Sequence, residues 1–219
     1  MKEQPILFSD QRVRNLLMGQ QTQTRRIMKP LAFTPAQDNH EGCYGFDVIN
    51  NHLQGHQFLE MSNLSYQCPF GQLGDILWVR ETWRGPVVPT ESVADYTRSP
   101  AAFRHSRYCQ YRADYNESGD RQDNSGQAGW QTAIHMPRWA SRINLRINDI
   151  RVEKIQDITD DDIAAEGIQT DLNFLNNFFT MNSDLVMPKD IYKKAWTQQY
   201  GGTSWEVNPW VWVIGFEKV

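Results

Sequence analysis

The sequence contains none of the short motifs that mark the common cofactor and metal classes. It has no GxGxxG, P-loop, GxSxG or HExxH, and its five histidines are scattered at positions 40, 52, 56, 105 and 135. Each of these motifs places a phosphate, a nucleophilic serine or a zinc ion by its own residue spacing. Their absence argues against dinucleotide, serine-hydrolase and zinc-protease chemistry, and we expect no cofactor and no metal.

Cysteines and long apolar runs are also scarce. Cys43, Cys68 and Cys109 stand far apart and outside any CxxC or Cys/His pattern, so we expect neither a disulfide framework nor a zinc site. No apolar run approaches the length of a membrane span, and the N-terminus lacks the apolar stretch and cleavage site of a secretory signal. We therefore expect a cytoplasmic protein without a membrane partner.

Lysine and arginine are absent from one segment of the chain and concentrated in two others. The net charge of -4 argues against a protein that binds polyanions over its whole surface. Residues 31–60 have four acids and no Lys or Arg, whereas residues 1–30 have six Lys/Arg against two acids and residues 138–154 have five against two. The two basic segments would form one patch if the fold brings them together.

What is present is enough apolar and aromatic material for a sizeable core. The 219 residues are 40% hydrophobic and 12% aromatic, which is typical of a globular protein. The N-terminal part predicts a strand over 5–8, a helix that Ser9 caps and Gly19 ends, and a strand over 22–28. In that helix Val13, Leu16 and Leu17 have the spacing of a buried stripe.

Further along, alternating residues predict strands over 75–82 and from 143 onward, the latter with a bulge at 148–149. Thr159 is expected to cap a short acidic helix that Gly167 ends, and Pro188 to begin a helix that ends before Gly201. The apolar segment after Asn208 predicts a strand inside a sheet. With no repeated βαβ unit, the order favours an α+β fold with a small, bent, mixed β-barrel and peripheral helices.

Two stretches interrupt this pattern. Residues 31–72 and 84–131 are polar and rich in Gly, Pro, Ser and Asn, so we expect insertions in a single domain over 1–219. The short apolar run 46–49 predicts a hairpin in the first insertion, residues 108–112 a weak strand in the second, and 115–129 the most mobile part of the chain.

Candidate functional residues lie just outside the predicted elements. Arginine suits phosphate because its planar fork makes paired hydrogen bonds, tryptophan offers a face to a base, and a carboxylate accepts hydrogen bonds from an exocyclic amine or acts as an acid or base. The alternative is that the arginines pair with neighbouring acids and that the tryptophans are core residues. The set is Thr24, Arg25, Arg26, Arg80, Glu81, Trp83, Arg138, Trp139, Arg142 and Glu166.

Four ordered motifs resemble one known family. They read LxxGxxTxTRR near the N-terminus, GxxGDxLxVRE in the middle, TxxDxxAEGI after the long strand, and SWEVNPWVWVIGFE at the end. This combination is similar to the ASCH family of the PUA-like superfamily, and with HMPRWASRI it resembles the ASCH-type proteins of bacteriophages and prophages. The resemblance implies a PUA-like barrel with a ligand cleft between the barrel and its first helix.

The resemblance also implies function. Some small ASCH enzymes deacetylate 4-acetylcytidine and another member is a ribonuclease; the amidohydrolases carry GxKTxT, with a catalytic Lys and Thr and a later Glu. Thr24 and Glu166 match that Thr and Glu, whereas Gln21 occupies the Lys position. A carboxamide has no basic lone pair, although it hydrogen-bonds a base edge well.

We therefore expect a protein that binds RNA, another nucleic acid or a modified nucleoside, acting in the cytoplasm of a bacterial host. The first alternative is a metal-independent amidohydrolase or ribonuclease that uses Thr24 and Glu166. The second is a phage factor that binds a host protein, for example against host defence. The polar insertions and the aromatic content motivate this last class.

Overall fold

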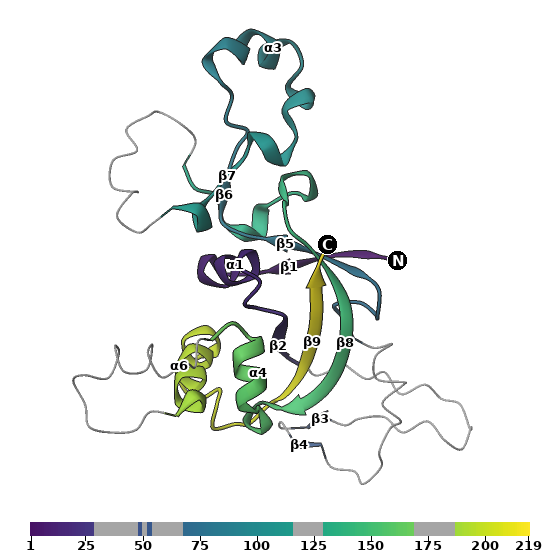
Figure 1. Cartoon of the computed structure of the whole chain (residues 1–219), viewed down its shortest axis with the longest axis vertical. Helices are drawn as coiled ribbons and strands as arrows, with labels where there is room; N and C mark the ends of the chain where they lie inside the picture. The colour runs from purple at the N-terminus through teal and green to yellow at the C-terminus, as the bar shows by residue number, and fades with distance from the viewer. Residues whose placement is uncertain (29–47, 50–51, 54–67, 116–128, 169–186) are drawn as a thin grey trace, which may run out of the picture. The chain divides into compact units, whose positions relative to one another are not determined.

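A computed structural model describes residues 1–28, 48–49, 52–53, 68–115, 129–168 and 187–219 (Figure 1). In this part the chain is an α+β protein with a five-stranded mixed sheet, as the sequence predicts. None of the described helices is both long enough and apolar enough to cross a membrane. In the range 31–72, where an insertion or hairpin is expected, strands β3 (Val48–Ile49) and β4 (His52–Leu53) pair antiparallel, whereas positions 46 and 47 lie outside the described residues. Most of the mobile segment expected at 115–129 lies outside the described residues.

The sheet has the strand order β1-β5-β8-β9-β2. Its strands are β1 (Glu3–Leu7), β5 (Ile76–Arg80), β8 (Asn144–Lys154), β9 (Trp210–Lys218) and β2 (Gln23–Ile27). β1 runs parallel to β5, whereas β5 with β8 and β2 with β9 are antiparallel. The C-terminal strand β9 is internal, as its continuous apolar sequence predicts. Among the described residues β1 and β2 are open edges, so the sheet does not close into a barrel there.

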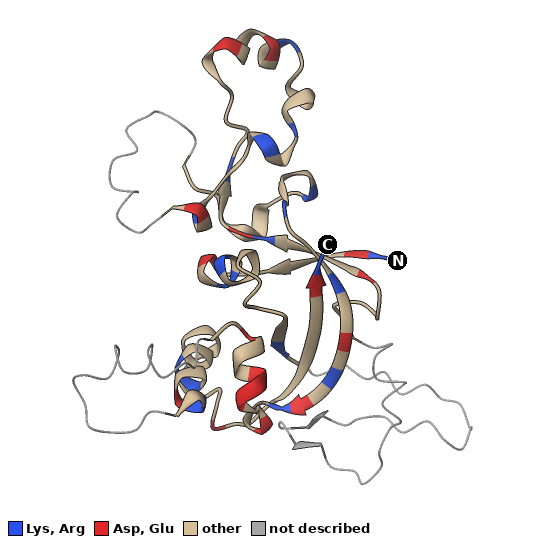
Figure 2. Ribbon diagram, viewed as in Figure 1, with Lys and Arg blue, Asp and Glu red and all other residues tan. Residues whose placement is uncertain are grey.

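The chain divides into two compact units, each discontinuous in sequence. The first unit is Met1–Thr22, Pro69–Asn148 and Phe216–Val219, and the second is Gln23–Cys68 and Asp149–Gly215. The first has 14 Lys/Arg and 11 Asp/Glu, a net charge of +3, whereas the second has 8 and 15, a net charge of -7. Each of the two basic segments, 1–30 and 138–154, is divided between the units, whereas the segment 31–60 falls in the second. Figure 2 shows the charged residues of the described part of the chain.

In the first unit, helix α1 (Asp10–Leu17) follows β1. Ser9 occupies the N-cap position, but its side chain makes no capping hydrogen bond, so the predicted cap is present in position only. Gly19 follows the helix with a left-handed φ of 72°, as predicted. Val13 and Leu16 are buried, but Leu17 is 38% exposed. The predicted apolar stripe is therefore wrong at Leu17, because the buried face of α1 is turned toward Asn15, which is buried beside Val13 and Leu16.

Short elements occupy the second predicted insertion. β6 (Trp83–Arg84) and β7 (Gln110–Tyr111) pair antiparallel, which confirms the weak strand expected at 108–112. Trp83, Tyr111, Met136 and Ala140 form an apolar cluster, against which Trp139 packs. The other elements of the unit are α3 (Val93–Arg98) and the single-turn helices η2 (Thr90–Ser92), η3 (Pro100–Phe103), η4 (Ser106–Tyr108), η5 (Arg112–Asp114), η7 (Ala133–His135) and η8 (Arg138–Ala140).

The second unit contains α4 (Asp160–Ala165), α6 (Pro188–Tyr200) and the single turn η9 (Ile155–Asp157). Thr159 caps α4 and Gly167 follows it with a positive φ, as predicted. α6 has the predicted bounds, because Pro188 occupies its first turn and Gly201 follows its last residue. The core joins both helices to β9 through Ile155, Ile158, Ile163, Tyr192, Trp196, Trp205, Val211 and Val213.

Candidate functional site

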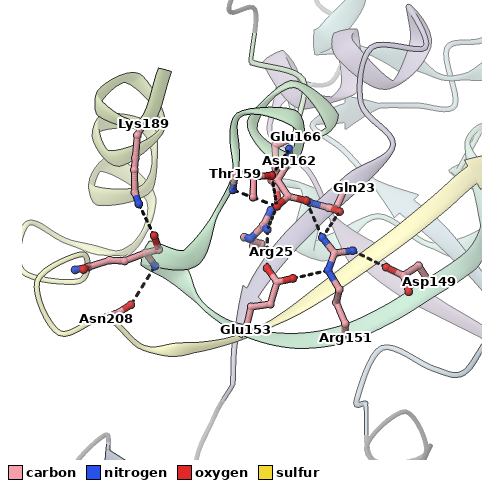
Figure 3. Close-up of polar contacts among 11 residues, drawn as sticks. Gln23, Arg25, Asp149, Arg151, Glu153, Thr159, Asp162, Glu166, Lys189 and Asn208 are labelled. Carbon is pink, nitrogen blue, oxygen red and sulfur yellow. Dashed lines mark hydrogen bonds and ion pairs between the residues drawn. The ribbon is translucent and has the colours of Figure 1, made fainter. Parts of the chain in front are cut away.

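Arg25 of the TRR motif lies on β2 with its side chain entirely buried. Its guanidinium is 2.9 Å from a carboxylate oxygen of Glu153, 3.0 Å from Asp162 and 3.5 Å from Glu166 (Figure 3). The three acids come from β8, from the first turn of α4 and from the residue that ends α4. One buried cation therefore organises carboxylates from two other elements of the second unit.

A second arginine completes this arrangement. Arg151 on β8 lies 2.5 Å from Asp149, 2.5 Å from Glu153 and 2.7 Å from Asp162, and it donates to the side-chain oxygen of Gln23 at 3.0 Å. We call Arg25, Arg151, Asp149, Glu153, Asp162 and Glu166 the ionic network. Its two cations and four acids leave an excess of two carboxylates.

Asp162 is the junction of the network. It contacts both arginines, and it forms a capping box with Thr159, whose hydroxyl donates to its carboxylate at 2.8 Å. Burial raises the pKa of Asp162, but the hydrogen bonds from Thr159 and the charge of Arg25 outweigh this effect and lower the pKa to about 2. The helix cap and the ion pairs therefore depend on the same carboxylate in its charged form.

The first unit contains a separate buried ion pair. Arg142 donates to both oxygens of Glu81 at 2.9 and 3.0 Å and to both oxygens of Asp114 at 2.8 Å, and it lies 3.9 Å from the ring centroid of Tyr111. The Glu81 side chain is 1% exposed. Burial raises the pKa of Glu81, although Arg142 opposes the shift, and the charges of Asp114 and Asp10 add to it.

Trp78 supports two more of the predicted arginines. The guanidinium of Arg80 lies 4.7 Å from the Trp78 ring centroid and that of Arg138 lies 5.8 Å from it. Arg138 pairs with both oxygens of Glu3 at 2.8 and 3.3 Å, but the two side chains are 40% and 49% exposed. Arg80 donates to the main-chain oxygen of Ile134 at 3.1 Å in an exposed setting. These guanidiniums lie at the surface, beside an aromatic ring.

The remaining predicted residues are distributed over both units. Thr24 is fully buried on β2 in the second unit, and Arg26, half-buried, stands opposite Trp212 of β9. Gln21 is buried in the first unit. Trp83 is buried in the apolar cluster and packs edge-on against the half-buried Trp139 at 5.6 Å. For these two tryptophans the structure favours the core interpretation.

The sequence identified some of the residues in these ion pairs and not others. It named Arg25, Glu166, Arg142 and Glu81 but did not pair them, and it did not name Arg151, Glu153, Asp162 or Trp78 as site residues. A usable pattern existed, because Arg151 and Glu153 lie two apart on one strand and Trp78 and Arg80 two apart on another, so each pair shares a face. In the part of the chain that the structure describes, no group of three or more His, Cys, Asp or Glu could hold a metal ion.

No protein-family model, curated protein or solved structure matches the chain.

Replacing Arg25 tests the network as a stabilising element. Arg25→Ala leaves Glu153, Asp162 and Glu166 without their shared buried cation, and we expect a loss of roughly 3–5 kcal/mol in unfolding free energy. Arg98→Ala is the control, because the ion pair of Arg98 with Asp95 joins side chains that are 80% and 67% exposed and should contribute about 0–1 kcal/mol. Urea unfolding followed by circular dichroism measures both. Equal small losses would contradict the assigned role of Arg25.

The lowered pKa of Asp162 predicts an acid-dependent loss of stability. The folded pKa is about 2 against an ordinary 3.8, so the stabilisation is complete above pH 4 and disappears as the pH falls through 2. The unfolding free energy of Asp162→Asn should be about 2 kcal/mol lower than that of the wild type at neutral pH. It should also vary less with pH, so the unfolding free energies of variant and wild type approach each other in acid. Urea titrations between pH 2 and pH 6 provide the measurement. A difference that stays constant over this range would count against the pairing.

Proposed function

We propose that the chain binds nucleic acid or a modified nucleotide, with Arg80 and Arg138 of the first unit as phosphate contacts beside Trp78. The observation that carries this proposal is the pair of surface guanidiniums over one indole ring, at 4.7 and 5.8 Å. Arginine makes paired hydrogen bonds to phosphate, and a guanidinium held against an aromatic face loses little freedom when it binds. The net charge of +3 on this unit favours an anionic partner.

Burial separates these arginines from the others in the predicted set. The exposed pair between Arg138 and Glu3 is worth about 0–1 kcal/mol, so a phosphate can replace the carboxylate at little cost. Arg25 and Arg142 would have to leave carboxylates that are 0% and 1% exposed, and breaking a buried pair costs roughly 3–5 kcal/mol. We therefore assign these two arginines to holding Glu166 and Glu81 in position.

The second unit would read the base rather than the phosphate. Its net charge of -7 and the two surplus carboxylates of the ionic network disfavour phosphate and suit a hydrogen-bond donor such as an exocyclic amine. Glu166, which Arg25 holds at 3.5 Å, is the proposed acceptor, and Thr24 and Arg26 remain the proposed polar contacts of the same unit, whereas Gln21 remains a proposed contact in the first unit.

The four motifs support an ASCH-type, PUA-like assignment for this binding role. The first motif spans the end of α1 and β2, the second β5, the third α4 and the fourth β9. We propose on this basis a PUA-like arrangement of the sheet, a phage or prophage origin, and action in the cytoplasm of a bacterial host.

Hydrolysis is the second candidate, favoured by the buried Thr24 and Glu166 within the acidic unit. We expect no turnover of 4-acetylcytidine by the wild-type chain, because the amide of Gln21 supplies no basic nitrogen. Chromatography of the products with wild type, Glu166→Gln and Gln21→Lys tests this expectation. Wild-type turnover that Glu166→Gln removes, with thermal unfolding unchanged, would make the chain an enzyme and show that Gln21 does not preclude catalysis.

The binding proposal predicts a specific loss when the two surface arginines are removed. Arg80→Ala with Arg138→Ala should weaken binding of single-stranded RNA or DNA at least tenfold at low salt and reduce the salt slope by about 0.7 per arginine. Arg146→Ala is the control, because Arg146 is 49% exposed, pairs with Glu217 on the same unit and is not one of the two arginines over the Trp78 ring. Fluorescence anisotropy over a salt series measures all three proteins.

Two results would overturn the proposal. One is the absence of saturable binding by the wild-type chain to RNA, DNA or a panel of modified nucleosides at low salt. The other is an equal loss in the Arg146→Ala control, which would indicate a nonspecific charge effect.

A further inference from the structure

A small lobe connects β6 to β7 in the first unit. Residues 85–109, here called the arginine lobe, contain α3 and the single turns η2, η3 and η4. Phe103 is 7% exposed at its centre, with ring centroids of Tyr96 at 5.5 Å and Tyr108 at 4.8 Å. In Figure 1 the lobe extends from the β6–β7 pair, with α3 far from β1 and β5. The lobe thus has an aromatic core of its own.

The surface of this lobe is basic over a continuous stretch. From Arg98 to Arg107 the sequence has three arginines, one histidine and no acid. Arg104 and Arg107 are exposed, and neither pairs with a carboxylate of any residue that the structure describes. The acids of the lobe are Glu91 and Asp95, of which Asp95 contacts Arg98 at 3.4 Å.

Local contacts hold Arg107 and the base of the lobe in a defined setting. Arg107 lies over the Tyr108 ring at 4.7 Å, and its main-chain N–H donates to Nδ1 of His105 at 3.1 Å. At the base of the lobe the N–H of Val87 donates to the carbonyl of Tyr108 at 2.6 Å. Gly85 packs so closely there that a Cβ would meet the same carbonyl oxygen at 3.0 Å. A preformed scaffold of this kind lowers the entropy lost on binding.

We propose that the arginine lobe binds phosphates of a polynucleotide through Arg104 and Arg107, as a second contact beyond Arg80 and Arg138. This inference rests on the proposed nucleic-acid binding and narrows its ligand to a polynucleotide. The arginine groups stand at separate places on one unit, so a ligand that reaches both spans several nucleotides. A basic surface with aromatic rings is the usual composition of sites for single strands.

The length dependence of binding tests this inference. Fluorescence anisotropy compares a labelled mononucleotide with single strands of about 4, 8 and 16 nucleotides, using wild type, Arg104→Ala/Arg107→Ala and the Arg146→Ala control. We expect wild-type affinity to rise with length. The double variant should bind the longest strand at least tenfold more weakly, with a salt slope lower by about 1.4 because two phosphate contacts are lost, and should bind the mononucleotide as wild type does.

Charge-preserving variants separate the phosphate contact from a change in the fold. Arg104→Lys/Arg107→Lys should keep the salt slope of wild type and lose part of the affinity, because lysine lacks the planar fork. If this variant loses the slope as the alanine variant does, with unchanged thermal unfolding, the phosphate contact is excluded.

The remaining outcomes distinguish this inference from the proposed function. If Arg80→Ala/Arg138→Ala weakens binding and the lobe variant binds long strands as wild type does, the lobe has no part in binding and the proposed function stands. If wild type binds no nucleic acid, both fail. If a polyaspartate peptide binds the wild-type lobe as tightly as a 16-nucleotide strand and with the same dependence on Arg104 and Arg107, the lobe is an acidic-protein site and the polynucleotide inference is overturned.

Discussion

The second unit depends on the burial of one guanidinium. Arg25 is 0% exposed, and an unpaired buried cation costs several kcal/mol, so the surrounding elements must supply negative charge at its position. β8 does so with Glu153, and α4 does so with Asp162 and Glu166. The register of β2 and the placement of the α4 cap are thus coupled through one side chain.

The same criterion of burial separates the two kinds of arginine in this protein. Arg25 and Arg142 each pair with a carboxylate that water hardly reaches, Glu166 and Glu81, and removal of either arginine would leave that carboxylate without compensation. Arg80 and Arg138 lie beside Trp78, where Arg80 donates to the carbonyl of Ile134 and the exposed carboxylate partner of Arg138 is exchangeable. One residue type therefore serves two purposes, and solvent exposure determines which.

Charge also distinguishes the two units. The first unit has a net charge of +3 and contains both surface arginine groups, which favours phosphate. The second unit has a net charge of -7 and contains the ionic network, which disfavours phosphate. The proposed phosphate contacts therefore lie in the first unit, and the ionic network of the second unit is a separate feature.

Much of the secondary structure followed from signals within a few residues. The Thr159 cap, the Pro188 start and the glycines at 19, 167 and 201 each act over one helical turn, and strand alternation acts over two residues. Leu17 was assigned wrongly because the orientation of α1 toward the core is set by its packing partners. The sheet order was likewise beyond local patterns, since it joins strands far apart in the chain.

The sequence by itself determined which chemical groups are available: arginines next to aromatic residues, acids in the first turn of one helix, and a carboxamide at Gln21 in the N-terminal motif. Only the tertiary structure decided which of these groups meet. Arg25 and Glu166 are 141 positions apart, and no local pattern encodes the contact or the burial that converts one arginine into a structural cation. Burial is a property of the packed chain, and it is burial that leaves Arg80, Arg138, Arg104 and Arg107 accessible to a ligand.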